Sequence, residues 1–199
     1  MIMRSIPEKE SFTVEFLSGR KKLSDSKLLN EVVALANTFG GIIYVGIEDN
    51  GEITGITKEH YDLAEIKSLI SNKTEPSLCV QTEIIEEETT FGRTFVLAIR
   101  VPMSRSVVAS VDGRIMGRRL KRDGSPEVFS WSQDNISIRN KELETLAYSE
   151  KLLAAASDED SDALEISRLK SLVANNPYGD EIHYLYFLQI KYALKHQQQ

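Results

Sequence analysis

Three acidic residues near the N-terminus, Glu10, Glu15 and Asp49, have the chemistry to hold a divalent cation. Carboxylate oxygens are the ligands that Mg²⁺ and Mn²⁺ prefer, and such a metal can activate water beside a scissile phosphate. Glu10 and Glu15 are five positions apart, which places them on opposite faces of a regular strand. Convergence therefore requires Glu10 to precede the strand or to lie on a bend. The alternative is that Glu15 and Asp49 are ordinary edge-strand and turn residues.

A second group of residues has the chemistry to bind phosphate. Cations crowd into one short segment, with Phe129 and Trp131 close behind it: Arg114, Arg118, Arg119, Lys121 and Arg122. Such a segment can grip a nucleic-acid backbone and stack a base. The basic loop Arg20-Lys21-Lys22 adds to this expectation. The alternative is a solvated hairpin whose arginines pair with acidic neighbours, at ~0–1 kcal/mol each.

The segment 34–55 is predicted to position Asp49. It begins as the last turns of an apolar-faced helix, stops at Gly40-Gly41, and continues as a buried strand from Ile42 to Ile47. Asp49-Asn50-Gly51 is a strong signal for a tight turn. The acidic residues 48 and 49 are thus expected at the end of a rigid strand, where scaffolds often present functional groups.

The neighbouring elements predict a mixed sheet. Strands are expected over 8–17, 78–85, 94–101 and 107–111, with an acidic hairpin loop at 86–92. Two amphipathic helices are expected, one after Ser24 or Asp25 and one over 59–71. Together these elements indicate an α/β (α+β) fold in which two helices pack on a mixed β-sheet, followed by an α-helical C-terminal extension.

A change in composition near residue 140 predicts two domains, 1–138 and 139–199. Residues 1–139 carry 18 Lys+Arg and 20 Asp+Glu, a net charge of −2, and residues 140–199 carry 6 and 10, a net of −4. Helices are expected over 141–156, 162–175 and 177–195. This acidic tail is interpreted as a helical cap, a dimer contact or a contact for a protein partner.

Bulk properties exclude several classes of function. The chain has no Gly-x4-Gly-Lys-Ser/Thr loop for ATP, no Cys/His zinc cluster, and no apolar run long enough for a membrane span. One cysteine, Cys79, excludes an internal disulfide, favours a cytoplasmic location, and is expected in the core. The net charge of −6 means that any nucleic-acid binding must depend on local basic density.

Two motifs together resemble a known family. Residues 34–55 contain Ala-x-Ala-Asn-Thr-x-Gly-Gly, four apolar residues, Gly46, and then Asp49 followed by Gly-x-Ile-x-Gly. With Glu-Ser-x-x-x-Glu-Phe at 10–16, this pattern is similar to the Schlafen-type AlbA-like domain over roughly residues 8–130. That family includes DNA-binding regulators and the nuclease core of animal Schlafen proteins, and its later Arg-then-Gly/Ser stretch corresponds here to 119–125.

The resemblance implies that Glu10, Glu15 and Asp49 match an acidic triad that cleaves tRNA and ribosomal RNA with Mg²⁺ or Mn²⁺. It also implies DNA or RNA as the partner. Two features depart from the nuclease pattern. Leu17 stands where a lysine commonly follows Glu-Phe, and the chain has one lobe where animal nuclease Schlafens have two, so a comparable groove would need a homodimer.

Three functions therefore remain open from the sequence. The first is a metal-dependent endoribonuclease that cuts tRNA or other structured RNA. The second is a non-catalytic DNA-binding transcriptional regulator that uses the same basic surface. The third is a protein-interaction module in which the acidic tail matters and nucleic acid does not.

Overall fold

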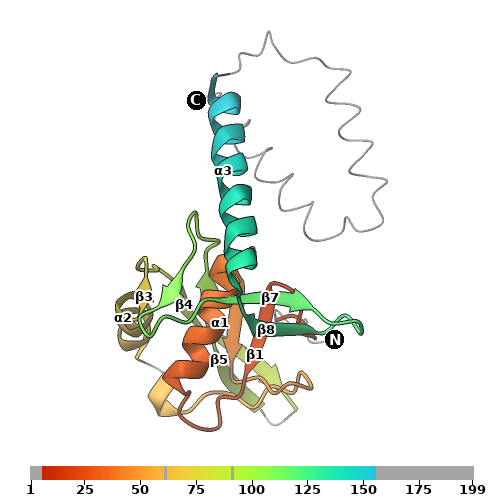
Figure 1. The fold of residues 1–199 in the computed structure, drawn as a ribbon. Coiled ribbons are helices and arrows are strands. Elements are labelled where there is room, and N and C mark those ends of the chain that lie inside the picture. The colour runs from red at the N-terminus through yellow and green to blue at the C-terminus, as the bar shows by residue number, and fades with distance from the viewer. Residues whose placement is uncertain (1–5, 61, 91, 156–199) are drawn as a thin grey trace. The chain divides into compact units, whose positions relative to one another are not determined.

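The computed structural model describes residues 6–60, 62–90 and 92–155. A four-stranded mixed sheet lies at its centre, in the order β1-β2-β5-β4 (Figure 1). Its strands are β1 Val14–Leu17, β2 Gly41–Val45, β4 Gln81–Thr89 and β5 Gly92–Val101. β1 and β2 are parallel, and the other two pairs are antiparallel. The predicted mixed sheet is therefore confirmed.

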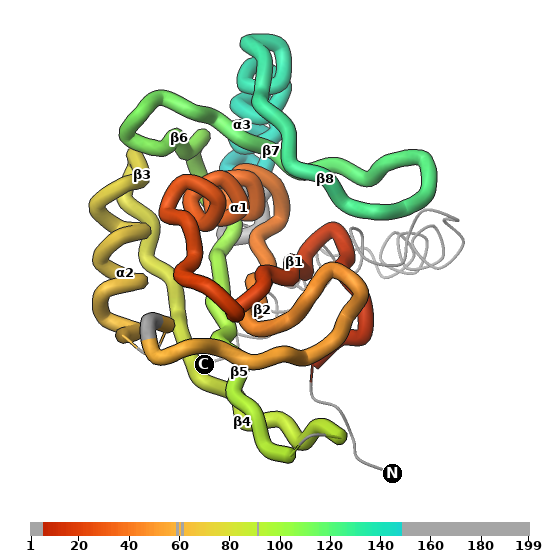
Figure 2. The backbone as a smooth tube through the Cα atoms, turned by 90° about the horizontal axis from the view of Figure 1, so that it is seen from below, coloured from red at the N-terminus to blue at the C-terminus, as the bar shows by residue number. Residues whose placement is uncertain are grey.

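The other described elements are helices and two short sheets. The helices are α1 Asp25–Asn37, η1 Lys58–His60, α2 Leu63–Asn72 and α3 Gln133–Ala155. β3 Thr74–Glu75 pairs with β6 Ala109–Ser110, and β7 Met116–Leu120 forms a hairpin with β8 Pro126–Ser130. α1 lies between the sheet and the segment that carries β6 and β7 (Figure 2).

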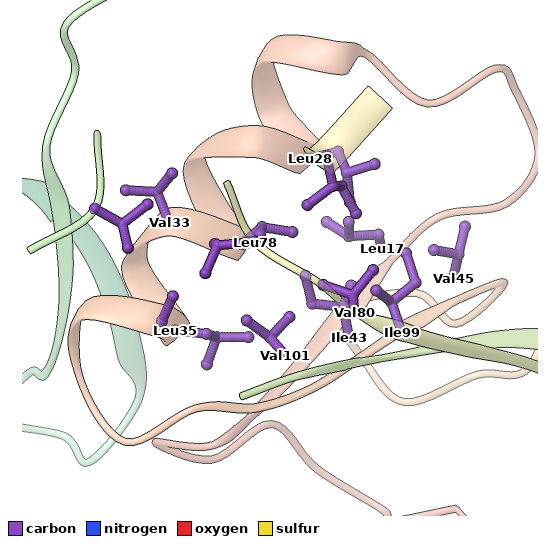
Figure 3. Close-up of a cluster of buried hydrophobic side chains, with 14 of the residues drawn as sticks. Leu17, Leu28, Val33, Leu35, Ile43, Val45, Leu78, Val80, Ile99 and Val101 are labelled. Carbon is purple, nitrogen blue, oxygen red and sulfur yellow. The ribbon is translucent and has the colours of Figure 1, made fainter. Parts of the chain in front are cut away.

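Strand alternation divides the core between the two faces of the sheet. Leu17, Ile43 and Ile99 face α1 and form the larger cluster with the buried side of that helix (Figure 3). Phe16, Tyr44 and their neighbours form a smaller cluster on the other face. The expectation that Cys79 lies in the core is wrong: Cys79 is exposed, and its neighbours Leu78 and Val80, in the segment before β4, are buried instead. Adjacent residues of β1 thus serve different cores.

Several element boundaries differ from the sequence expectations. The first strand begins at Val14 instead of near residue 8, because Ser11 and Val14 close a turn with two backbone hydrogen bonds. The acidic segment 86–89 continues β4 instead of forming a loop, since each residue pairs with β5. The strand expected over 107–111 is reduced to the two residues of β6.

The C-terminal helix starts earlier than expected, at Gln133 instead of Lys141. Ser132 and Asn135 explain this start, because the Asn135 Oδ1 accepts from the Ser132 backbone N–H at 3.0 Å and the Asn135 N–H donates to the Ser132 hydroxyl at 3.4 Å. The chain divides into two compact units after Glu144. The helices predicted over 162–175 and 177–195 lie outside the described residues. None of the described helices combines the length and apolar character needed to cross a membrane.

Candidate functional site

Asn37, the last residue of α1, links this helix to the start of the basic hairpin. Its side-chain amide donates to the carbonyl oxygens of Val108 at 2.8 Å and Met116 at 2.9 Å, and its Oδ1 accepts from the Val108 N–H at 2.7 Å. Each buried backbone group left without a partner would cost ~1–3 kcal/mol. The asparagine of the motif therefore anchors β7 on α1.

Gly41 sets the close approach of β1 and β2. Its φ is 151°, and a Cβ at this position would lie 2.2 Å from the carbonyl oxygen of Thr13. That oxygen accepts a hydrogen bond from the Ile42 N–H at 2.8 Å. A side chain at 41 would therefore separate the strand that follows Glu10 from the strand that leads to Asp49.

Glu10 lies before β1, as convergence with Glu15 requires. One of its carboxylate oxygens accepts from the Phe16 N–H at 3.1 Å, so its side chain folds back along the strand that follows. The charge of Glu10 also acts on the carboxyls of Glu15 and Glu31. The two glutamates of the Glu-Ser-x-x-x-Glu-Phe motif thus lie in one electrostatic environment.

Glu15 forms a buried ion pair with an arginine of the basic segment. Arg118 Nη2 lies 2.7 Å from a Glu15 carboxylate oxygen, and Arg118 Nη1 lies 3.3 Å from Glu31. The Arg118 side chain has no exposed area, and the exposed fractions of the Glu15 and Glu31 side chains are 14% and 12%. We call these three residues the buried ion cluster. It joins β1, α1 and β7.

The buried ion cluster holds two carboxylates against one guanidinium. Burial raises the pKa of Glu15, and the Arg118 charge opposes this rise. Burial and the nearby Glu15 charge raise the pKa of Glu31 to about 7. Glu31 therefore binds a proton at a pH where an exposed glutamate is ionised.

Asp49 and Glu48 lie on the predicted tight turn, where the Gly51 N–H donates to the Glu48 carbonyl at 2.8 Å. Asp49 is exposed. The Glu48 carboxylate accepts three hydrogen bonds, from Thr54 Oγ1 at 2.6 Å, Ser18 Oγ at 3.0 Å and Arg20 Nε at 3.1 Å. Hydrogen bonds from these donors lower the pKa of Glu48, and the bond from Thr54 has the largest effect. We call this group the exposed turn network.

The expected metal site does not fit this arrangement. Across the described ranges, no group of three His, Cys, Asp or Glu side chains is placed to hold a metal ion. Glu15 faces Arg118, and Asp49 is exposed on its turn. The arrangement brings Glu10 and Glu15 near Glu31, a residue that was not predicted.

The cations of the predicted basic segment separate into two sets. Arg118 is buried, and a side chain with no exposed area cannot contact a phosphate from solution in this conformation. Arg119, Lys121 and Arg122 are exposed. Arg119 lies over the ring of Phe129 at 4.6 Å from its centroid and pairs with Glu127 at 2.6 Å. Neighbouring strand residues point to opposite faces, which explains why two adjacent arginines differ.

The remaining predicted cations lie elsewhere on the surface. Arg114 pairs with Asp112 and donates to Ser26 on α1 at 2.9 Å. Arg20 belongs to the exposed turn network, and Lys21 and Lys22 are exposed beside it in the loop that joins β1 to α1. In both views this loop and the turn of the β7–β8 hairpin lie apart (Figures 1 and 2). The predicted cations do not form one patch.

Comparison with known proteins identifies the family. The sequence profile described as Schlafen, AlbA_2 matches residues 10–127, which include both acidic motifs and most of the basic hairpin. The chain belongs to this family. The Schlafen AlbA_2 match ends before α3 begins, so the helical extension lies outside it.

No curated protein matches the chain. Among solved structures, the crystal structure of the DIP2311 protein from Corynebacterium diphtheriae is similar, with 24% sequence identity and a TM-score of 0.42. The match covers 59% of this chain and 22% of that one, so the chain spans about a fifth of the length of that protein.

Sequence reasoning missed Glu31 and the inward role of Arg118. The sequence held one signal for Glu31, because this acidic residue stands between the apolar pairs Leu28-Leu29 and Val32-Val33. A charged residue on an apolar helix face needs a buried counter-ion. No local signal distinguished Arg118 from Arg119 as that counter-ion.

Proposed function

We propose that this Schlafen AlbA_2 domain binds nucleic acid through the outer face and turn of the β7–β8 hairpin. The observation that carries the proposal is the exposure of Arg119, Lys121 and Arg122 on one hairpin, with Arg119 held over the Phe129 ring. Phosphate contacts from arginine and lysine supply most of the affinity in such complexes. A planar guanidinium over an aromatic ring also offers a surface for a base.

The anchoring of the hairpin supports this proposal. Its base is tied to α1 by the Asn37 hydrogen bonds and by the buried ion cluster. Cations on a fixed scaffold lose less conformational entropy on binding than cations on a loose loop. A two-stranded ribbon is also narrow enough to enter the major groove of duplex DNA. The net charge of −6 does not oppose binding at this place, because the contact depends on local charge.

A direct test is the affinity of the full chain for labelled duplex DNA, single-stranded DNA and structured RNA, measured by fluorescence anisotropy at several salt concentrations. We expect binding that weakens as salt rises. The variant Lys121→Gln/Arg122→Gln should lower the slope of log K against log salt by roughly 0.7–0.9 for each lost phosphate contact. Lys67→Gln/Lys73→Gln removes the same charge from an exposed part of α2 and its end, and it should bind as the wild type does.

Two results would contradict the proposal. Equal losses in both double variants would show that only net charge matters, and binding to none of the three polymers would favour a protein-interaction module. The choice between DNA and RNA follows from the order of affinities. A preference for duplex DNA would favour a transcriptional regulator.

Metal-dependent cleavage is a separate hypothesis, taken from the family resemblance. It forms no part of this proposal, because the proposal rests on the exposed cations of the hairpin and not on the carboxylates. Incubating tRNA with the protein and Mn²⁺ tests it. Cutting that is lost in Asp49→Ala while RNA binding is retained would add nuclease activity to the binding function. No cutting in either protein would leave binding as the function.

A further inference from the structure

We infer that Arg118 is the fixed counter-ion of the acidic motif, so that Glu15 serves a buried ion cluster instead of a divalent metal. The inference depends on the contacts of Arg118 with Glu15 and Glu31 and is independent of nucleic-acid binding. It assigns a structural role to a glutamate that the family pattern would place at a catalytic centre.

Arg118 also binds the backbone at the start of β1. Besides the two carboxylates, its Nη2 donates to the carbonyl oxygens of Val14 at 2.8 Å and Ser11 at 3.1 Å. Both oxygens belong to the turn that starts β1. Of the three nitrogens of this guanidinium, only Nε has no hydrogen-bond acceptor among the described residues. Arg118 therefore binds the segment 10–16 through both a side-chain oxygen and backbone oxygens.

A guanidinium in this position opposes a metal ion. Arginine stays protonated in proteins, so Arg118 places a permanent positive charge 2.7 Å from the Glu15 oxygen. A metal ion bound to the same oxygen at about 2.0–2.6 Å would meet that charge at close range. A metal ion at this oxygen would require Arg118 to leave, and this would break the hydrogen bonds and ion pairs that Arg118 makes with β1 and α1.

The first experiment compares Mn²⁺ binding by the wild type and Glu15→Gln, using electron paramagnetic resonance of the Mn²⁺ that remains in solution. The amide introduced by this substitution would keep an oxygen that accepts from Arg118 and would lose the charge that a metal needs. We expect the two proteins to bind Mn²⁺ equally. A wild type that binds Mn²⁺ tenfold or more tightly than Glu15→Gln would overturn the inference.

The second experiment measures the melting temperature of Arg118→Gln against Arg119→Gln. Both variants lose one arginine from adjacent positions of β7, but only Arg118 is buried. We expect Arg118→Gln to melt roughly 6–16 °C below the wild type, and Arg119→Gln within about 2 °C of it. Equal melting temperatures in the two variants would overturn the inference.

A double variant separates loss of the ion pair from general damage to the fold. Adding Glu15→Gln to Arg118→Gln removes one of the two carboxylates that lost their counter-ion, so the melting temperature should rise above that of Arg118→Gln alone. A further fall would contradict the inference. If Arg118→Gln does not fold, the Mn²⁺ comparison still decides the question, because it uses only the wild type and Glu15→Gln.

Discussion

The buried ion cluster and the exposed turn network contain the same chemical groups in opposite surroundings. In each, an arginine nitrogen lies close to a glutamate oxygen. The distance is 2.7 Å between Arg118 and Glu15 and 3.1 Å between Arg20 and Glu48. The Arg118 side chain has no exposed area, whereas 60% of the Arg20 side chain is exposed. Water therefore screens one pair and is excluded from the other.

The carboxyl pKa values show what this difference does. In the buried ion cluster, burial raises the pKa of Glu31 to about 7. In the exposed turn network, hydrogen bonds from Thr54 and Ser18 lower the pKa of Glu48. Desolvation exceeds the attraction of arginine at the first site, and hydrogen bonding exceeds desolvation at the second. A glutamate–arginine contact does not by itself give the sign of the pKa shift.

The largest effect is expected from substitutions that remove the glutamate of each ion pair. Glu15→Ala should destabilise the fold by roughly 2–4 kcal/mol, because Arg118 loses its closer carboxylate while still buried. Glu48→Ala should cost about 1 kcal/mol or less, because water can solvate Arg20. Urea unfolding followed by circular dichroism measures both values.

The slope of each unfolding curve with urea shows whether the two variants can be compared, since a changed slope would indicate a changed folded or unfolded state. Equal losses of stability in Glu15→Ala and Glu48→Ala would show that burial does not make the buried ion cluster contribute more stability than the exposed turn network.

The second prediction concerns pH and the raised pKa of Glu31. An unfolded glutamate releases its proton near 4.5, and the folded protein holds it until about 7. The folded state thus binds more protons in this window, so stability should fall by roughly 2–3 kcal/mol as the pH rises through it. The charges that act on Glu31 are Glu15 on β1, Arg118 on β7, Lys27 on α1 and Glu10 before β1.

Glu31→Gln should remove the contribution of Glu31 to this decline, leave the smaller one that the raised pKa of Glu15 makes, and make the protein more stable than the wild type at pH 8. Unfolding free energies measured at intervals from pH 5 to pH 8 give the two profiles. Glu8→Gln, at an exposed position, is the control for the loss of one negative charge. Parallel profiles for the wild type and Glu31→Gln would contradict the prediction.

The fold could be predicted from the sequence because its signals are local. The apolar face of α1, the buried strand after Gly40-Gly41 and the tight turn at Asn50-Gly51 are each set by neighbouring residues. The start of β1 could not be predicted as well. Phe12 continues the apolar alternation of Val14 and Phe16, so the sequence extends the strand too far toward the N-terminus. The Ser11–Val14 turn that ends the strand there is bound by Arg118, more than a hundred positions away.

The candidate site was less predictable for the same reason. The charges of Arg118 and Arg119 are visible in the sequence, but their burial depends on which face of β7 meets α1. Asn37 is another long-range case, since its amide bonds Val108 and Met116. A sequence motif shows which residues are present, but it does not show whether they bind a ligand or stabilise the fold.

The smallest expected effect tests the exposed turn network. Thr54→Val removes the hydrogen bond that contributes most to the lowered pKa of Glu48. A lowered folded pKa stabilises the protein above the unfolded value and loses this effect as the pH falls through the folded value. Thr54→Val should therefore raise the pKa of Glu48, measured by NMR, and cost less than about 1 kcal/mol at pH 7. The part of this cost that depends on the charge of Glu48 should vanish in acid and should also be absent when Thr54→Val is made in Glu48→Gln. A pH-dependent cost that persists in Glu48→Gln would mean that Thr54 acts through another group.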